Sequence, residues 1–174
     1  MSTSLDLSKL NLMDALDLAI LIEEEARQRY ELFASLIGRT ATGYNAGAFF
    51  ASMAENEAKH GTELLERRMA RFGKVPMKVK MMDIYDIEAP DSGAPRKGMS
   101  TVQAFELGLQ SEKKAHDFFN SALPGISDPE VKELFAELRD EELEHIDMLK
   151  EAMAKLPESA SVETENDPDD APYL

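Results

Sequence analysis

Four stretches of the chain place apolar residues on one face at helical spacing, and a glutamate interrupts each apolar stripe near its middle. In two of these stripes a histidine follows the glutamate three residues later, on the same helical face. The six polar residues on the inner faces are Glu23, Glu57, His60, Glu112, Glu142 and His145. Because an apolar helical stripe packs into a core, the pattern predicts an all-α bundle with a layer of polar side chains buried across its middle.

Start and stop signals separate the four stretches. The expected helices run from about Asn11 to Gly38, Asn45 to Gly73, Ser100 to Leu123 and Ser127 to Leu156. Short connections join the first two helices and the last two, which predicts two antiparallel helical hairpins. The connection from Gly73 to Met99 can return along the whole bundle, because an extended chain covers about 3.3 Å per residue. Two hairpins joined by a long crossover is the connectivity of ferritin-like four-helix bundles.

The buried polar layer predicts a metal centre. Four unpaired carboxylates in a core would be strongly destabilising, and bound cations offset that cost. The heights along the bundle also match, since Glu23 and His60 are equally far from the first turn, and Glu112 and His145 are equally far from the second. The chain has no cysteine, so any metal is held by oxygen and imidazole nitrogen, a set of donors that suits iron or manganese.

With these residues in place, the sequence resembles the rubrerythrin branch of the ferritin-like superfamily over about residues 11–155. One Glu from each of two helices and Glu-x-x-His from each of the others is the ligand pattern of di-iron and di-manganese carboxylate bundles. The resemblance implies two Fe ions per chain, with Mn as the alternative metal. The implied roles are bridging ligands for Glu57 and Glu142, terminal ligands for Glu23 and Glu112, and ligands of one ion each for His60 and His145.

The same resemblance implies a di-iron oxidoreductase of the peroxidase or ferroxidase type. Such a protein reacts with O2 or peroxide and takes electrons from an external donor or from Fe²⁺. Two alternatives stay open: a di-manganese catalase-like enzyme, and a non-enzymatic bundle that metal stabilises for binding or as a scaffold. The sequence also departs from rubrerythrins proper. It has no cysteines for a rubredoxin-type domain, and Ala115 stands where they carry an additional glutamate tied to peroxide reduction.

Charge and hydropathy exclude several classes of partner. The net charge of −15 makes nucleic acid and anionic membranes poor partners. The sequence has no run of eighteen apolar residues that could span a membrane. The N-terminal residues contain neither a basic leader nor a hydrophobic segment, so we expect a cytoplasmic location. By analogy with the rubrerythrin branch, we expect a homodimer.

Two further residues are candidates for a catalytic role. Tyr30, two turns beyond Glu23, is expected to hydrogen-bond a ligand or relay electrons, or else to be an ordinary core tyrosine. His116, four residues after Glu112, is expected to be an alternative ligand or proton donor, or else a partly exposed histidine in a local contact. The glutamates that flank the ligands, Glu141 among them, are expected to lie in solvent.

The expected bundle domain covers residues 1–156, and an acidic tail covers residues 157–174. The tail has six acidic residues and no basic ones, a composition typical of a disordered segment. We nevertheless expect it to pack against its own or a neighbouring subunit.

Overall fold

The structure is a computed structural model that describes residues 6–37, 45–80 and 95–163. Four long helices make up most of these residues: α1 (Leu12–Ile37), α2 (Ala46–Phe72), α4 (Thr101–Ala122) and α5 (Pro129–Met153). The short 3-10 helices are η1 (Leu7–Lys9), η2 (Leu123–Gly125) and η3 (Glu158–Ser161). The described residues contain no strand, and none of their helices is long and apolar enough to cross a bilayer. The all-α prediction is confirmed.

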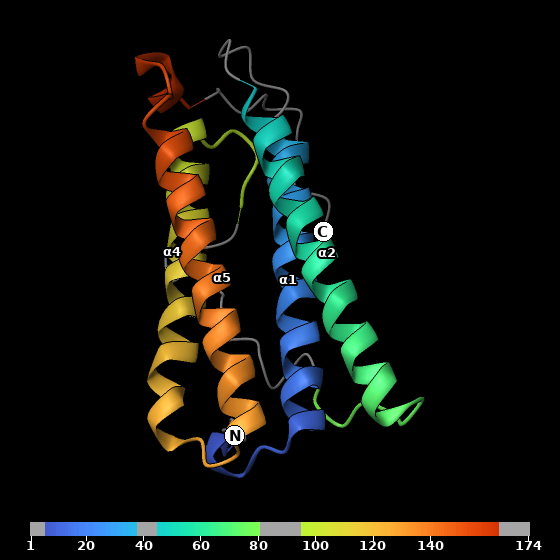
Figure 1. Cartoon of the computed structure of the whole chain (residues 1–174). Coiled ribbons are helices and arrows are strands. Elements are labelled where there is room, and N and C mark those ends of the chain that lie inside the picture. Colours follow the sequence, from blue (N-terminus) through green and yellow to red (C-terminus); the bar gives the residue numbers. More distant parts are fainter. Residues whose placement is uncertain (1–5, 38–44, 81–94, 164–174) are drawn as a thin grey trace.

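The helices form two antiparallel hairpins that lie side by side. α1 packs mainly on α2, and α4 packs mainly on α5 (Figure 1). α2 ends at one end of the bundle and α4 begins at the other, so the chain crosses the length of the bundle between them (Figure 1). This is the ferritin-like connectivity that the sequence predicts. The expected stop at Gly38 and most of the crossover fall in residues 38–44 and 81–94, outside the described residues.

Local capping fixes where the helices begin and end. Ser100 and Gln103 form a capping box at the start of α4, in which each side chain accepts a hydrogen bond from the other's backbone N–H. The Asp128 side chain accepts hydrogen bonds from two backbone N–H groups in the first turn of α5, where Pro129 has no N–H to satisfy. Gly73 ends α2 with a φ of 63°, a conformation that costs glycine little. The helix boundaries therefore lie within a few residues of those expected.

The hydrophobic core is divided into two clusters, one on each side of the polar layer. Large buried side chains towards the start of α1 are Leu16, Ile22, Phe119, Phe135 and Leu138. Those towards the end of α1 are Phe33, Phe50, Met53, Phe105 and Leu149. Because side chains in cores pack at nearly crystalline density, these clusters close the bundle to water above and below its middle.

A buried ion pair fixes the chain where it leaves α2. Arg68, 2% exposed, forms an ion pair with Asp17 of α1, which is fully buried. The same guanidinium donates a hydrogen bond to the backbone oxygen of Val75, at 2.8 Å. Val79 then packs into the apolar cluster near the start of α1. The described start of the crossover is therefore anchored to the bundle at Val75 and Val79, while most of its side chains are exposed.

The described part of the acidic tail, residues 157–163, packs on the bundle of its own chain. Ala160 of η3 is fully buried, and η3 contacts α4. The Glu163 carboxylate forms an ion pair with Arg96 and accepts a hydrogen bond from Gln103, at 2.7 Å. Residues 164–174, to which the rest of the tail prediction applies, lie outside the described residues.

Candidate metal centre

The six residues singled out by the sequence converge between the two apolar clusters. Five of them are buried and His60 is partly buried. Three groups each offer three ligand atoms that lie within 4.8 Å of one another. These groups are Glu57–His60–His145, Glu112–Glu142–His145 and Glu23–His60–Glu141. All four long helices thus contribute candidate ligands to one polar layer.

His145 of α5 lies at the centre of the arrangement. Its Nδ1 atom is 3.2 Å from a carboxylate oxygen of Glu57, 3.3 Å from one of Glu112 and 3.8 Å from one of Glu142. These three carboxylates come from α2, α4 and α5. Such distances bring the donors of three helices within the reach of shared ions.

His60 and Glu23 complete the layer on the α1–α2 side. The Nδ1 atom of His60 lies 3.9 Å from Oε2 of Glu23. The imidazole rings of His60 and His145 are nearly parallel, with centroids 5.4 Å apart and an interplanar angle of 9°. The two Glu-x-x-His motifs therefore face each other across the bundle axis.

Unsatisfied polar atoms show that these residues fit a bound cation. Among the described residues, neither Oε2 of Glu23 nor Nδ1 of His60 has a hydrogen-bond partner, although both atoms are shielded from solvent. Buried polar atoms are nearly always paired, and a divalent ion would satisfy both of these. Four carboxylates and two imidazoles form a donor set that suits iron or manganese.

Burial and neighbouring charges shift the acidities of the centre. Burial raises the pKa of Glu23 to about 7. Burial alone would raise the pKa of Glu112 as well, but hydrogen bonds with His145, Glu142 and Tyr30 outweigh it, so its pKa is lowered. Burial alone would lower the pKa of His145, but its hydrogen bond and charge interaction with Glu112 raise it. The metal-free centre therefore retains protons that a cation would have to displace.

Tyr30 contacts the centre directly. Its hydroxyl donates a hydrogen bond to Oε1 of Glu112, and the whole side chain is buried. Burial and the Glu112 charge raise the pKa of Tyr30 well above its ordinary value, so the hydroxyl stays protonated. The structure therefore places Tyr30 on a candidate ligand, whereas its role as an electron relay stays a prediction.

His116 and Glu141 lie differently from each other with respect to the centre. The contact of His116 is a local one, with its Nδ1 atom 3.1 Å from Asp117, and its part in the chemistry stays a prediction.

The expectation that Glu141 lies in solvent is wrong. Its carboxyl is half-buried, its pKa is raised by that burial, and one of its oxygens joins Glu23 and His60 in the third ligand group.

The sequence contains a signal for Glu141 that the apolar stripe did not reveal. Glu141 precedes His145 by four residues, so both can lie on the same side of α5. The apolar stripe indicates the middle of the buried face. Burial at the edge of that face depends on how closely α2 approaches α5, which only the assembled bundle determines.

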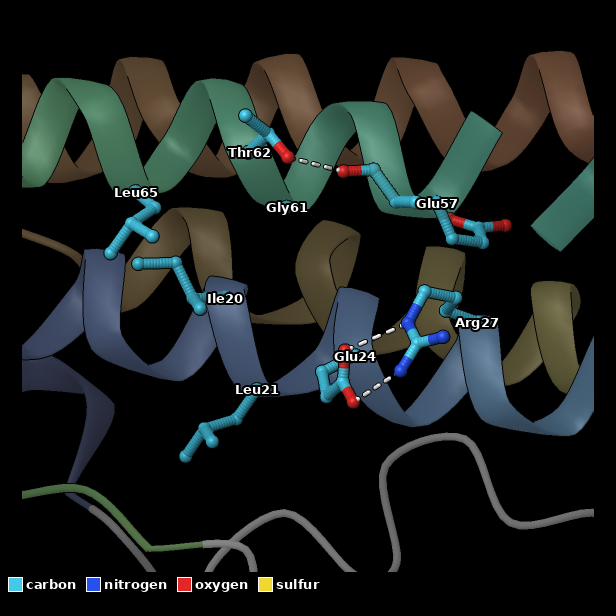
Figure 2. A pocket seen from close by; sticks show the side chains of 9 residues that line it. Ile20, Leu21, Glu24, Arg27, Glu57, Gly61, Thr62 and Leu65 are labelled. Carbon is cyan, nitrogen blue, oxygen red and sulfur yellow. Dashed lines mark hydrogen bonds and ion pairs between the residues drawn. The ribbon is translucent and has the colours of Figure 1, made fainter. Parts of the chain in front are cut away.

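Two cavities reach the polar layer from outside. We call the first the α1–α2 groove, and it has a volume of about 520 Å³. Gly61 of α2, one of its lining residues, faces α1 (Figure 2). Its lining is mostly apolar, with Glu57 among its polar residues and an ion pair between Arg27 and Glu24 along one side (Figure 2). We call the second the α2–α5 pocket, of about 240 Å³. The residues that line this pocket are His60, Glu63, Leu64, Arg67, Glu137 and Glu141.

Helix connectivity and ligand placement together define a ferritin-like carboxylate bundle. The model of the rubrerythrin family matches residues 14–153, and the chain belongs to this family. Membership implies a di-iron centre, for which the structure supplies carboxylate and histidine donors.

One solved structure is similar over most of both chains. It is an uncharacterised conserved protein from Magnetospirillum magnetotacticum MS-1, with a TM-score of 0.70 and 27% sequence identity. The similarity covers 85% of this chain and 97% of that chain. No curated protein matches the chain.

Proposed function

We propose that this chain is a di-iron oxidoreductase that reacts with O2 or peroxide and draws electrons from an external donor or from Fe²⁺. The observation that carries the proposal is the convergence of four buried carboxylates and two imidazoles in one layer, with ligand atoms within 4.8 Å in each group. The shielded, unsatisfied atoms of Glu23 and His60 support a cation between them. Family membership supports iron as that cation.

The six residues would hold two iron ions, with Glu57 and Glu142 among their carboxylate ligands. The ions, when bound, supply the electrons that reduce the oxidant and accept replacements from the donor. The protein's own part is to orient the ligands and to exclude water. Tyr30 holds Glu112 in place by its hydrogen bond, and the apolar clusters on both sides keep bulk water out.

The α1–α2 groove is suited to admit a small neutral oxidant. Ile20, Leu21 and Leu65 give it an apolar lining, and Glu57 brings it to the polar layer. Gly61 has no side chain to fill the space between α1 and α2 (Figure 2). The groove would therefore lead O2 or peroxide past mostly apolar walls to Glu57.

Anaerobic reconstitution with Fe²⁺ tests the proposal. We expect two ions per chain, followed by oxidation on addition of peroxide or O2, detected by near-ultraviolet absorbance. The variant Glu57→Gln/Glu142→Gln should lose both metal uptake and oxidation, whereas Glu55→Gln/Glu144→Gln, two exposed positions on the same helices, should lose neither. No uptake by the unaltered protein, or no oxidation by either reagent, would contradict the proposal.

The identity of the loaded metal tests the catalase-like alternative, and the Glu57→Gln/Glu142→Gln variant tests the scaffold alternative. A manganese-loaded protein that evolves oxygen from peroxide faster than the iron-loaded form would indicate the catalase-like activity. If the chain is a metal-stabilised scaffold, the Glu57→Gln/Glu142→Gln variant should have lower thermal stability. In that case the unaltered chain should show no turnover either. Sedimentation of the metal-loaded chain would test the homodimer expected from the family resemblance.

A further inference from the structure

Glu141 is a carboxylate at the centre that the six-residue pattern leaves out. It lies on α5 one residue before Glu142 and is half-buried rather than solvated. One of its oxygens lies within 4.8 Å of ligand atoms of both Glu23 and His60. The side chain is therefore close enough to share a cation with two residues of the polar layer.

Glu141 also lines the α2–α5 pocket, which connects this group of ligands with the surface. Three carboxylates and one guanidinium line the pocket: Glu63, Glu137, Glu141 and Arg67. Arg67 is ion-paired with Glu137 at 2.8 Å, so its charge is already balanced. The ion pair between Glu63 and Lys59 is much longer, at 3.8 Å. A cleft with an excess of one charge attracts ions of the opposite sign and raises their local concentration.

An unsatisfied atom beside the pocket indicates what the cleft receives. Glu23 is only 3% exposed, and its Oε2 atom is shielded from solvent. This atom nevertheless has no hydrogen-bond partner among the described residues. Nδ1 of His60, which lies 3.9 Å from that oxygen, is in the same condition. These two unsatisfied atoms, which could both bind a metal ion, thus lie close to the carboxylate of Glu141, which lines the α2–α5 pocket.

The α1–α2 groove is a poorer route for a cation. Its lining is mostly apolar, and the Arg27 guanidinium lies along it. That guanidinium is balanced by its ion pair with Glu24, so the groove has less excess negative charge than the α2–α5 pocket. A hydrated divalent ion would also gain little from its apolar walls.

We propose that divalent cations reach the centre through the α2–α5 pocket, where Glu141 binds them first and passes them to Glu23 and His60. The proposal rests on the metal centre described under the proposed function. It adds Glu141 as a fifth carboxylate, and thus a seventh functional residue, and it separates the path of the cation from that of the oxidant. No bond other than metal coordination forms or breaks in this step.

Uptake of Co²⁺ tests the proposal without redox chemistry. Stopped-flow absorbance of the cobalt bands would be recorded for the unaltered chain, Glu141→Gln and Glu133→Gln. Glu133 is exposed on the same helix and outside the pocket lining, so its variant removes the same charge without changing the pocket. We expect uptake on the order of ten-fold slower in Glu141→Gln, because a carboxylate that concentrates cations in the pocket is lost, and nearly unchanged in Glu133→Gln.

A second pair of variants tests the route without altering Glu141. Glu63→Lys places a cation in the pocket, and its side chain is 61% exposed, so the helix should tolerate the change. We expect it to slow Co²⁺ uptake on the order of ten-fold, whereas Glu55→Lys, exposed on α2 outside the pocket lining, should not. This pair remains informative if Glu141→Gln fails to fold.

The outcomes distinguish this proposal from the metal centre itself. Two ions bound by the unaltered chain, with uptake unchanged in both Glu141→Gln and Glu63→Lys, would overturn the cation route and leave the centre intact. Equal slowing in a pocket variant and its control would overturn it too, because general electrostatics would then explain the rates. Failure of the unaltered chain to bind Co²⁺ would overturn the centre and the route together.

Discussion

The hydroxyl of Tyr30 donates a hydrogen bond to Oε1 of Glu112, and this contact joins α1 to α4 inside the bundle. Direct contacts between these two helices are few compared with those inside each hairpin. Oε2 of the same carboxylate lies 3.3 Å from Nδ1 of His145. Glu112 is thus held from two sides, by a hydroxyl at one oxygen and an imidazole at the other. Its orientation is fixed before any ion arrives.

Replacement of Tyr30 by phenylalanine should weaken metal binding while preserving the packing. The ring stacks on Phe50 at a centroid distance of 6.1 Å, a contact that phenylalanine retains. Loss of a hydrogen bond to a charged group costs about 1.5–3 kcal/mol, and metal affinity should fall on the order of ten-fold. Urea denaturation of the metal-free protein and competitive Co²⁺ titration would measure the two effects. Unchanged affinity would show that Glu112 is positioned without the hydroxyl.

The acidity of Glu23 predicts how metal affinity depends on pH. Burial raises its pKa from 4.5 to about 7, so below about pH 7 a cation must displace the proton. Affinity should therefore rise with pH up to about 7, with protons released on binding, and gain nothing further from this group above that value. Calorimetric titration in buffers of different ionisation enthalpy would count the protons. Release that does not decrease above about pH 7 would contradict the assignment.

The contributions of Glu23 and His145 to the stability of the metal-free protein should change in the opposite direction. Between pH 4.5 and about 7 the folded state keeps the Glu23 proton that the unfolded chain loses, so stability falls as pH rises through this range. The pKa of His145 is raised because the hydrogen bond to Glu112 outweighs the effect of burial. The stability that it contributes is complete below pH 6.5 and is also lost as pH rises above that value. Urea midpoints measured with chelator from about pH 5 to about pH 8 would test this.

Removal of one partner of the Arg68–Asp17 ion pair should strongly destabilise the fold. Removing one partner of a buried pair leaves an uncompensated charge and costs about 3–5 kcal/mol. We expect Arg68→Met to lose that much stability in urea denaturation. Arg67→Met, whose partner Glu137 is exposed, should lose less than about 1 kcal/mol. The double variant Asp17→Leu/Arg68→Met should recover much of the loss, because no buried charge remains.

Gly61 offers a test of the oxidant path. A Cβ atom at this position would lie 3.5 Å from Cβ of Glu23, an ordinary contact, so Gly61→Ala should fold and gain up to about 1 kcal/mol from helix propensity. A leucine there should narrow the α1–α2 groove and slow oxidation by peroxide or O2 severalfold; because Glu23 is its neighbour, Co²⁺ binding by the same variant would be measured alongside. Single-turnover oxidation of the iron-loaded variants would measure this. Equal rates in the alanine and leucine variants would place the oxidant path elsewhere.

The fold could be predicted because its determinants are local in the sequence. The apolar stripes, the Ser100 capping box and Pro129 each act within one or two helical turns, and the structure has them where expected. The convergence of Glu23 with His60 also followed from their equal distance to one turn. These features need no knowledge of how the hairpins cross.

The features that sequence reasoning missed depend on how the helices approach each other. Asp17 and Arg68 are 51 residues apart, and nothing in either helical pattern pairs them. Glu141 lies at the edge of its stripe, where the position of α2 determines whether a side chain is buried. The α1–α2 groove is lined in part by Gly61, which faces α1 without a side chain, and the spacing of apolar residues does not reveal this.

The division of the hydrophobic core bears on how the protein exchanges its metal. Each end of the bundle has its own cluster of large apolar side chains, and neither cluster includes the proposed ligands. Each cluster joins residues of both hairpins, so the helices are held together at two levels whether or not ions lie between them. We therefore expect the chain to release bound metal ions when they are scarce and to reload them later as the same folded molecule.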